Sequence, residues 1–306
     1  MIATFFTKST PIQYVFAFIY LFGLFLAHLN SNVLIGAFSL FLLLASVLLA
    51  KFIISKNDLN KKNNYSLVAI CFFIGLFMQE IFIFDDILIA NIFLLLAIRK
   101  IYSIRNPINI NKKVFDASFW ILISSVFYIP ILYFFIILFT ALILYSHFNL
   151  KNLAVIISAI LSATIFLYLM EVISSGYINI VDFTTVLFFD IPTLDYISSF
   201  DENILNISWS IKTIVFFSFL IPLIFIFIWN MFIKKNERRR TTTLIFLTTI
   251  LALIIFISNL NSMAFVILFF PLIIIFTSCV EQARSKRVKN LVLSIGLLSP
   301  YLLILF

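Results

Sequence analysis

Long runs of apolar residues, separated by short polar segments, fill this chain from end to end. An α-helix needs about 20 apolar residues to cross the hydrocarbon core of a bilayer, which is roughly 30 Å thick. The runs predict membrane-spanning helices over residues 12–28, 32–54, 65–84, 87–104, 152–173, 209–233, 241–258, 262–280 and 290–306. The predicted fold class is therefore all-α, a polytopic transmembrane helix bundle.

The stretch 117–146 contains no charged residue and is too long for one ordinary span. Pro130 lies near its middle, where it disfavours a continuous helix. Two spans that turn near 127–130 bring the total to about 11 and place every basic cluster on one side of the membrane. A single crossing reverses this order and puts the acidic segment 174–207 on the inner side, so the two-span interpretation is favoured.

The distribution of charge predicts the orientation. With the N-terminus cytoplasmic and the C-terminus periplasmic, 20 of the 21 Lys and Arg residues fall on the cytoplasmic side. Nine of the 13 acidic residues fall on the outer side or at its boundary. The formal net charge of +8 is thus a topology signal. It predicts the lipid bilayer as a partner and no nucleic acid.

Composition and cysteine usage agree with one integral membrane domain over residues 1–306. Hydrophobic residues make up 63% of the chain and charged residues only 11%, whereas soluble proteins have about 25% charged residues. Cys71 and Cys279 both lie inside apolar runs, which supports neither a disulfide framework nor a metal site. The sequence contains no HExxH, no phosphate-binding Gly-rich loop and no Cys/His metal pattern, and it identifies no cofactor.

The segment 79–91, "QEIFIFDDILIAN", carries three acids within seven positions. We expect Asp85 and Asp86 at an outward-facing turn between the third and fourth spans, with Glu80 deeper and Asn91 on the next helix. A carboxylate inside the hydrocarbon costs roughly 2.5 kcal/mol or more, so Glu80 should face a cavity or a partner. The three carboxylates are candidate catalytic residues. The alternative is that the pair only ends the hairpin while Glu80 reaches the interface.

The segment 174–207 has five acids and no basic residue. It predicts a periplasmic acidic loop with an interfacial or re-entrant helix. Glu171 precedes this loop and Lys212 follows it, so the two can form an ion pair at the membrane boundary. Alternatively, Lys212 binds an anionic headgroup or a lipid diphosphate, and then Lys212, Asn91 and Glu171 are candidate substrate-binding residues.

Asp116 lies at the cytoplasmic entrance of the fifth span, near Arg99, Lys100 and Arg105 in the expected topology. Opposite charges at the ends of neighbouring helices favour pairing. Arg99, Arg105 and Asp116 are therefore predicted to form structural charge pairs that tie two spans together.

Three stretches, "MIATFFTKSTPIQYVF", "NIFLLLAIRKIYSI" and "KKVFDASFWILISSVFY", carry a resemblance. Together they resemble an uncharacterised family of polytopic inner-membrane proteins from Bacteroidota, over the length of the chain. The resemblance implies a multi-pass location in the inner membrane of a Gram-negative envelope and implies no activity. Asn91, Arg99 and Asp116 belong to these stretches, which makes them the first positions to mutate.

Three classes of function follow. The first is an enzyme that transfers a sugar from a polyprenyl-phosphate carrier on the periplasmic face, with Asp85 and Asp86 as base or metal ligand and Lys212 holding phosphate. The second is a small transporter or flippase, which requires charged or broken helices in mid-membrane. The third is a non-catalytic partner of an envelope secretion or assembly machine. The sequence favours cell-envelope biogenesis, with a lipid-linked glycan or other envelope proteins as partners.

Overall fold

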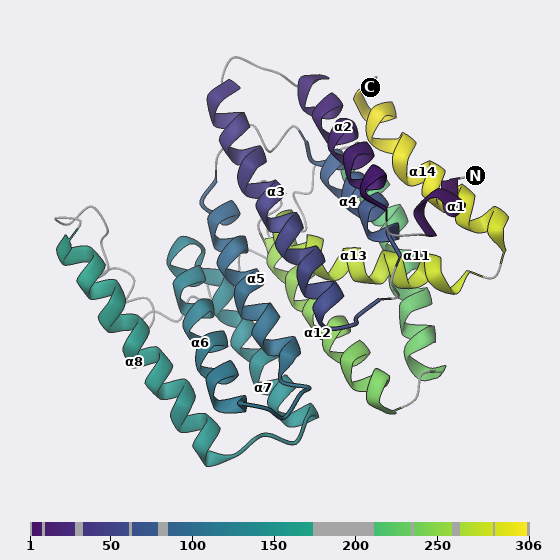
Figure 1. Ribbon diagram of the computed structural model, residues 1–306. Helices are drawn as coiled ribbons and strands as arrows, with labels where there is room; N and C mark the ends of the chain where they lie inside the picture. Colours follow the sequence, from purple (N-terminus) through teal and green to yellow (C-terminus); the bar gives the residue numbers. More distant parts are fainter. Residues whose placement is uncertain are drawn as a thin grey trace.

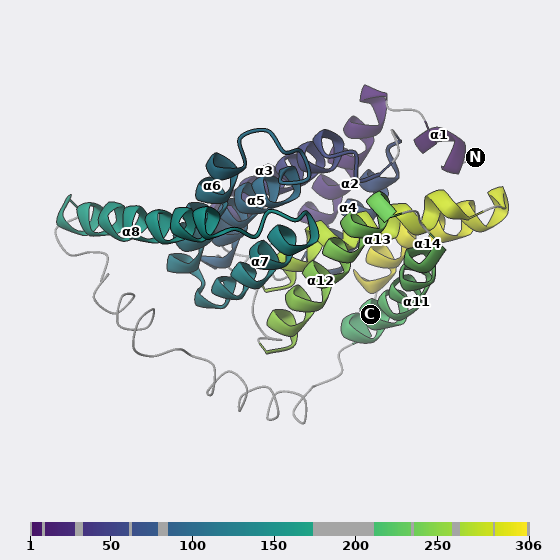
Figure 2. The same cartoon turned by 90° about the horizontal axis from the view of Figure 1, so that it is seen from below.

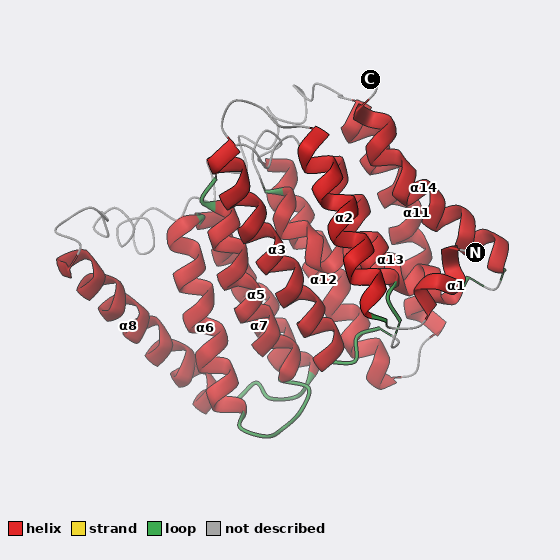
Figure 3. Ribbon diagram, turned by 45° about the horizontal axis from the view of Figure 1, so that its top comes forward, coloured by secondary structure: helices red, strands yellow, loops and turns green. Residues whose placement is uncertain are grey.

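The structure is a computed structural model in which helices dominate (Figure 3). It describes residues 2–7, 10–27, 33–60, 63–78, 85–173, 211–233, 236–258, 264–283 and 285–304. Within these ranges 89% of the residues are helical and no strand occurs, so the all-α prediction is confirmed. The predicted acidic loop 174–207 and Glu80 lie outside the described residues.

The helices follow the apolar runs closely (Figure 1). Their bounds are α1 Ile2–Thr7, α2 Pro11–Ala27, α3 Val33–Lys56, α4 Tyr65–Leu76, α5 Ile87–Ser103, α6 Ile110–Phe127, the 3-10 helix η2 Ile129–Tyr133, α7 Phe134–Leu144, α8 Leu150–Ile173, α11 Ile211–Ile233, α12 Asn236–Ser258, α13 Phe265–Gln282 and α14 Lys286–Ile304. Each predicted span corresponds to one of these helices over at least part of its length, and the short α1 was not predicted.

The predicted break within 117–146 is confirmed. Helix α6 ends at Phe127, and Tyr128 leaves the helical region with φ −153° and ψ 100°. Pro130 follows within η2, where it has no N–H to donate to a continued α-helix. The chain then enters α7, which packs back against α6.

Helix α4 is shorter than predicted. The apolar run suggested a helix over 65–84, but α4 ends at Leu76 and the chain turns at Phe77. The N–H of Phe77 bonds to the carbonyl oxygen of Ile74, three residues back, with φ −111° and ψ 22°. The apolar residues Phe77 and Met78 continue the run past Leu76, so hydropathy alone gave no sign of this turn.

Four of the described helices are long and apolar enough to cross a membrane. They are Val33–Lys56, Leu150–Met170, Arg239–Ile257 and Phe265–Gln282. Large apolar side chains such as Leu34 and Leu150 are 87% and 85% exposed, which would be unfavourable in water. These helices indicate a membrane protein. The count of eleven spans and the orientation of the termini stay predictions.

The bundle has a buried centre and exposed edges. Helix α13 is the most enclosed of the four, because 89% of its apolar stretch is buried. The corresponding share in α8 is 22%. Figures 1 and 2 place α8 at one edge of the molecule, against α6, and α14 with α1 at the other edge. Helix α13 contacts α4, α5, α11 and α12.

Small residues set the closest helix contacts. Among the described helices, α5 and α6 share the most extensive interface, and their small residues Ala90, Ala97, Ala117 and Ser118 are fully buried. Small side chains let helices in a membrane approach closely, and hydroxyl groups can bond across the interface. Ser124 Oγ of α6 donates to the carbonyl oxygen of Ala90, 2.5 Å away. This interface fixes the position of α5, the helix whose two ends carry the candidate sites.

Helix α14 packs closely against α4. A Cβ atom added at Gly75 would lie 2.7 Å from Cβ of Pro300, so only glycine fits there. Tyr20 Oη of α2 donates to the carbonyl oxygen of Leu297 at 2.7 Å, and Tyr301 Oη donates to that of Tyr20 at 3.2 Å. These contacts attach the last helix to the first part of the chain.

Candidate anion-binding cavity

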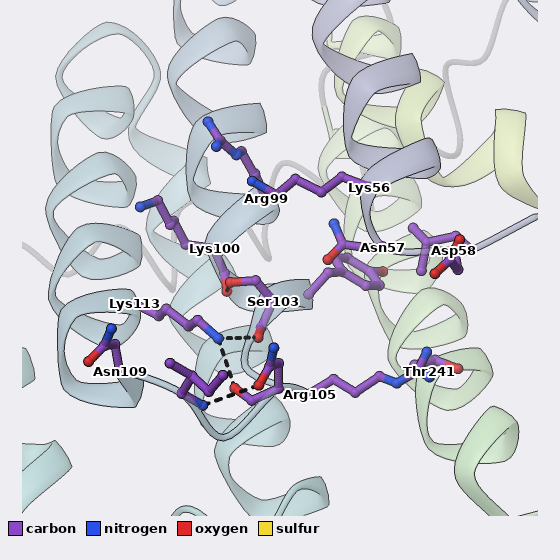
Figure 4. A pocket seen from close by; sticks show the side chains of 14 residues that line it. Lys56, Asn57, Asp58, Arg99, Lys100, Ser103, Arg105, Asn109, Lys113 and Thr241 are labelled. Carbon is purple, nitrogen blue, oxygen red and sulfur yellow. Dashed lines mark hydrogen bonds between the residues drawn. The ribbon is translucent and has the colours of Figure 1, made fainter.

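Three basic segments far apart in the sequence meet at one end of the bundle (Figure 4). They are the end of α3, the end of α5 with the loop and first turn of α6, and the start of α12, which contributes Thr241 to the lining. Together they line a partly open cavity of about 550 Å³, which we call the basic cavity. It is lined by Lys56, Asn57, Asp58, Leu59, Arg99, Lys100, Tyr102, Ser103, Arg105, Asn106, Ile108, Asn109, Lys113 and Thr241.

The lining is strongly cationic. Five of the lining side chains carry a positive charge, Lys56, Arg99, Lys100, Arg105 and Lys113, and only that of Asp58 carries a negative charge. Cations gathered around one hollow repel one another and raise the local concentration of anions. The volume falls within the range of roughly 300–1,000 Å³ that is typical of ligand pockets. The arrangement is suited to an anion of moderate size.

Lys113 closes the turn between α5 and α6. Its Nζ donates to the carbonyl oxygens of Ser103 at 2.7 Å and Asn106 at 2.8 Å. These carbonyls lie at and beyond the C-terminal end of α5, where a cation also interacts favourably with the helix dipole. Burial lowers the pKa of Lys113, which precedes the apolar part of α6, and the nearby charge of Lys100 lowers it further. A bound anion would relieve this repulsion.

Phe52 supports two of the other cations. The Arg99 guanidinium lies 4.9 Å and the Lys56 ammonium 5.5 Å from the centre of its ring. Both distances fall within the roughly 6 Å over which a ring attracts a cation. The aromatic ring holds both groups without neutralising them. Within the part of the chain that the structure describes, neither Arg99 nor Arg105 forms an ion pair.

The predicted tie between α5 and α6 involves Asp116. Its Oδ2 lies 2.5 Å from Nζ of Lys100, and both side chains are about one-third exposed. Arg99 and Arg105, which were predicted as charge-pair residues beside Asp116, line the basic cavity instead. Lys100 is thus the cation in the lining that has its own carboxylate, and the guanidinium groups stay available for a ligand.

The acidic turn, Asp85 and Asp86, precedes α5 at the end remote from the basic cavity. Oδ1 of Asp85, the residue before the N-cap Asp86, accepts a hydrogen bond from the N–H of Ile87 at 3.0 Å, so this acid satisfies the first N–H of the helix. Asp86 is exposed and its side chain makes no capping bond. Asn91 is buried on α5, next to the Ala90 carbonyl that accepts the Ser124 bond.

The other predicted site residues are not brought together by the described parts. Glu80 lies outside the described residues. Glu171 and Lys212 lie in α8 and α11, but their side chains lie outside what the structure describes. A convergence of Glu80 with Asp85 and Asp86, and a pair between Glu171 and Lys212, therefore stay predictions.

The segments 51–62 and 99–113 carry part of the predicted cytoplasmic charge, and the cavity between them was not predicted from the sequence. A usable signal was present. Cations follow the ends of the spans 32–54 and 87–104, which the topology predicts to lie at the same side of the membrane. What the sequence lacked was the adjacency of α3 and α5, which the structure supplies.

Neither a metal-binding group nor a similar protein identifies the function of the basic cavity. Among the described residues, no group of three His, Cys, Asp or Glu side chains is placed to hold a metal ion. Comparison of the chain with protein families, curated proteins and solved structures gave no match. The resemblance to the Bacteroidota family therefore stays a prediction.

Proposed function

We propose that this chain is a multi-pass protein of the cell inner membrane that binds a phosphate-bearing lipid headgroup in the basic cavity, as part of cell-envelope biogenesis. The observation that carries the proposal is the gathering of five cations with one carboxylate around about 550 Å³. Basic pockets between the ends of transmembrane helices on the cytoplasmic side commonly bind anionic headgroups. Guanidinium groups such as Arg99 and Arg105 suit phosphate because they can donate two parallel hydrogen bonds.

The proposed topology gives this site a direction. If the basic end faces the cytoplasm, as the positive-inside rule suggests, the headgroup comes from the inner leaflet. A phosphate-bearing lipid includes both phospholipids and polyprenyl-phosphate carriers of glycans. A non-catalytic partner of an envelope machine would also use such a site, to hold a lipid at its interface.

A second candidate function concerns the acidic turn at the other end of α5. There, a polyprenyl-phosphate-linked sugar would be handled on the periplasmic face, with a carboxylate as base. The exposure of Asp86, which makes no capping bond, favours it over Asp85 for this role. Asp86→Asn, which keeps size and polarity, should then fail to restore the envelope of a deletion strain, whereas Asp85→Asn should restore it. Full complementation by Asp86→Asn would rule this function out.

The lipid proposal is tested in nanodiscs of phosphatidylcholine with increasing phosphatidic acid. Arg99→Gln with Arg105→Gln should weaken binding by about tenfold or more, since the loss of even one charged hydrogen bond costs about 1.5–3 kcal/mol. Lys151→Gln is the matched control, because this exposed lysine at the start of α8 lies outside the lining. Equal affinity of the wild type and the double variant would overturn the proposal.

A further inference from the structure

A second cavity adjoins the basic cavity. It has a volume of about 250 Å³, and Asp58 lines both cavities. Its wall is made by the end of α3, the Asn-rich segment that leads to α4, and α13. We call it the amide cavity, after the polar side chains Asn60, Asn63, Asn64, Ser66 and Thr277 in its lining.

The amide cavity contains an unsatisfied acceptor. Nδ2 of Asn60 donates to Oγ1 of Thr277. Oδ1 of Asn60 is buried and has no hydrogen-bond partner among the described residues. A buried carbonyl oxygen without a donor is costly, and nearly all such groups in proteins are paired. This atom therefore calls for a ligand that brings a hydrogen-bond donor.

The rest of the amide wall is held in place by its own bonds. Nδ2 of Asn63 donates to Oε1 of Glu281 at 2.6 Å, and Nζ of Lys51 donates to Oδ1 of Asn64 at 2.8 Å. Lys51 also lies 3.9 Å from the ring centre of Tyr14. Side chains that are fixed in this way form a preorganised surface, which reduces the entropy lost when a ligand binds.

Asp58 lies between the cavities in a backbone position that does not favour it. The end of α3 has the bonds of a Schellman motif, from the Leu59 N–H to the Ile54 carbonyl at 3.2 Å and from the Asp58 N–H to the Ser55 carbonyl at 3.5 Å. Asp58 takes the left-handed position of this motif, with φ 49°, where glycine is usual.

A negative charge at this place also opposes the dipole at the end of the helix. Glycine or asparagine would fit the backbone of residue 58 better than aspartate does. The carboxylate of Asp58 is best explained by its surroundings, because Asp58 lines both the basic cavity and the amide cavity. Between them, it can accept hydrogen bonds from hydroxyl groups.

We propose that the two cavities form one site for a phosphorylated polyol or sugar headgroup. The phosphate lies among the cations of the basic cavity, and the hydroxyl groups extend into the amide cavity. Asp58 and Oδ1 of Asn60 accept hydrogen bonds from these hydroxyls, and the amide groups are suited to them because a hydroxyl both donates and accepts. This inference rests on the proposed binding of a phosphate-bearing lipid and names the chemistry of its headgroup.

The test compares three lipids in phosphatidylcholine nanodiscs that carry the same single charge: phosphatidylpropanol, phosphatidylglycerol and phosphatidylinositol. Their headgroups beyond the phosphate have no hydroxyl, two hydroxyls and five hydroxyls, respectively. The wild type should bind phosphatidylinositol most tightly and phosphatidylpropanol most weakly, with an overall difference of about fivefold or more, since each hydrogen bond contributes about twofold to tenfold. Equal affinity for all three would overturn this inference and leave the proposed function standing.

Two variants locate the preference. Asp58→Asn retains a residue that tolerates positive φ, and Asn60→Leu removes the unsatisfied acceptor. Each should bring the affinity for phosphatidylinositol close to that for phosphatidylpropanol, and leave the latter within about twofold. Ser162→Ala, in α8, is the control. If Asp58→Asn keeps the full preference, the bipartite site is wrong. If the wild type bound none of the three anionic lipids, the proposed function itself would be wrong.

Soluble competitors identify the source of the headgroup. Inositol 1-phosphate and glycerol 1-phosphate should displace the lipids only at concentrations at least about tenfold higher, because the acyl chains add apolar contacts. Displacement at equal concentrations would assign the same site to a free phosphate ester. Failure of inositol 1-phosphate to compete at any concentration would contradict headgroup recognition by these cavities.

Discussion

The two ends of α5 carry opposite charges in opposite surroundings. At its start, Asp85 caps the helix and Asp86 is exposed. At its end, Arg99 and Lys100 join residues from α3 and α12 around a cavity that is partly open to solvent. An isolated charge in water is screened and weakly coupled to others, whereas several charges of one sign around one hollow act together on an anion that enters it. Convergence of several elements, more than the rarity of a polar residue in an apolar run, therefore marks a binding site.

The largest expected effect comes from reversing charge at each end. Arg99→Glu with Arg105→Glu should weaken binding of phosphatidic acid in nanodiscs by about a hundredfold or more, because two attractions become repulsions. Asp86→Lys, at the exposed turn, should change the same affinity by less than about twofold. A marked gain in affinity in Asp86→Lys, which makes the protein more positive, would show that the net charge of the protein, and not the basic cavity, controls binding.

A smaller effect separates the two acids of the turn. Asp85→Ala should lower the free energy of unfolding by about 1 kcal/mol, because the Ile87 N–H loses its capping acceptor. Asp86→Ala should change it by less than about 0.5 kcal/mol, since an exposed side chain that makes no capping bond contributes little. Thermal unfolding in detergent, followed by circular dichroism, measures both. A larger cost at Asp86 would mean that this carboxylate has a partner.

The Lys100–Asp116 pair should contribute less still. Both side chains are about one-third exposed, so solvent screens the pair, and a coupling energy of about 0.5 kcal/mol is expected. A double-mutant cycle with Lys100→Met and Asp116→Asn measures it. Asp116→Asn should strengthen binding of phosphatidic acid by about twofold, because Lys100 is then left without its carboxylate. Weaker binding would place Asp116 in the site.

The smallest effect is on pH dependence. The pKa of Lys113 is lowered by burial and by Lys100, so this lysine loses its proton below the usual lysine pKa of 10.5. A lowered lysine pKa means that the positively charged lysine destabilises the folded state. As pH rises through the lowered pKa of Lys113, this cost to folding disappears. At the same time the bound anion loses the attraction of one positive charge. Affinity for phosphatidic acid should therefore fall before pH 10.5, and Lys113→Arg should delay the fall. An identical pH profile in both proteins would contradict this role.

The sequence predicted the helices well and their mutual arrangement poorly. The thickness of the bilayer sets the length of an apolar run. The predicted spans 12–28 and 32–54 therefore agree closely with the helices Pro11–Ala27 and Val33–Lys56. The break near Pro130 was also predictable, because proline cannot donate the next helical bond. The end of α4 at Leu76 was not, because apolar residues continue beyond it.

The candidate site depended on contacts that hydropathy does not encode. Lipid is as apolar as the helix surfaces, so packing in a membrane is decided by small residues and local fit. The contact of Gly75 with Pro300 and the Ala90–Ser124 bond are examples, and neither follows from an apolar run. The same holds for Asp58, whose position between two cavities results from the turn at the end of α3.

The most direct test of the basic cavity is a structure of the protein in nanodiscs that contain phosphatidylglycerol, solved with a bound antibody fragment. Our account predicts density for a phosphate in the basic cavity, within hydrogen-bond distance of the Arg99 or the Arg105 guanidinium group. Phosphate density that occurs only elsewhere on the protein, with water alone in the basic cavity, would contradict it.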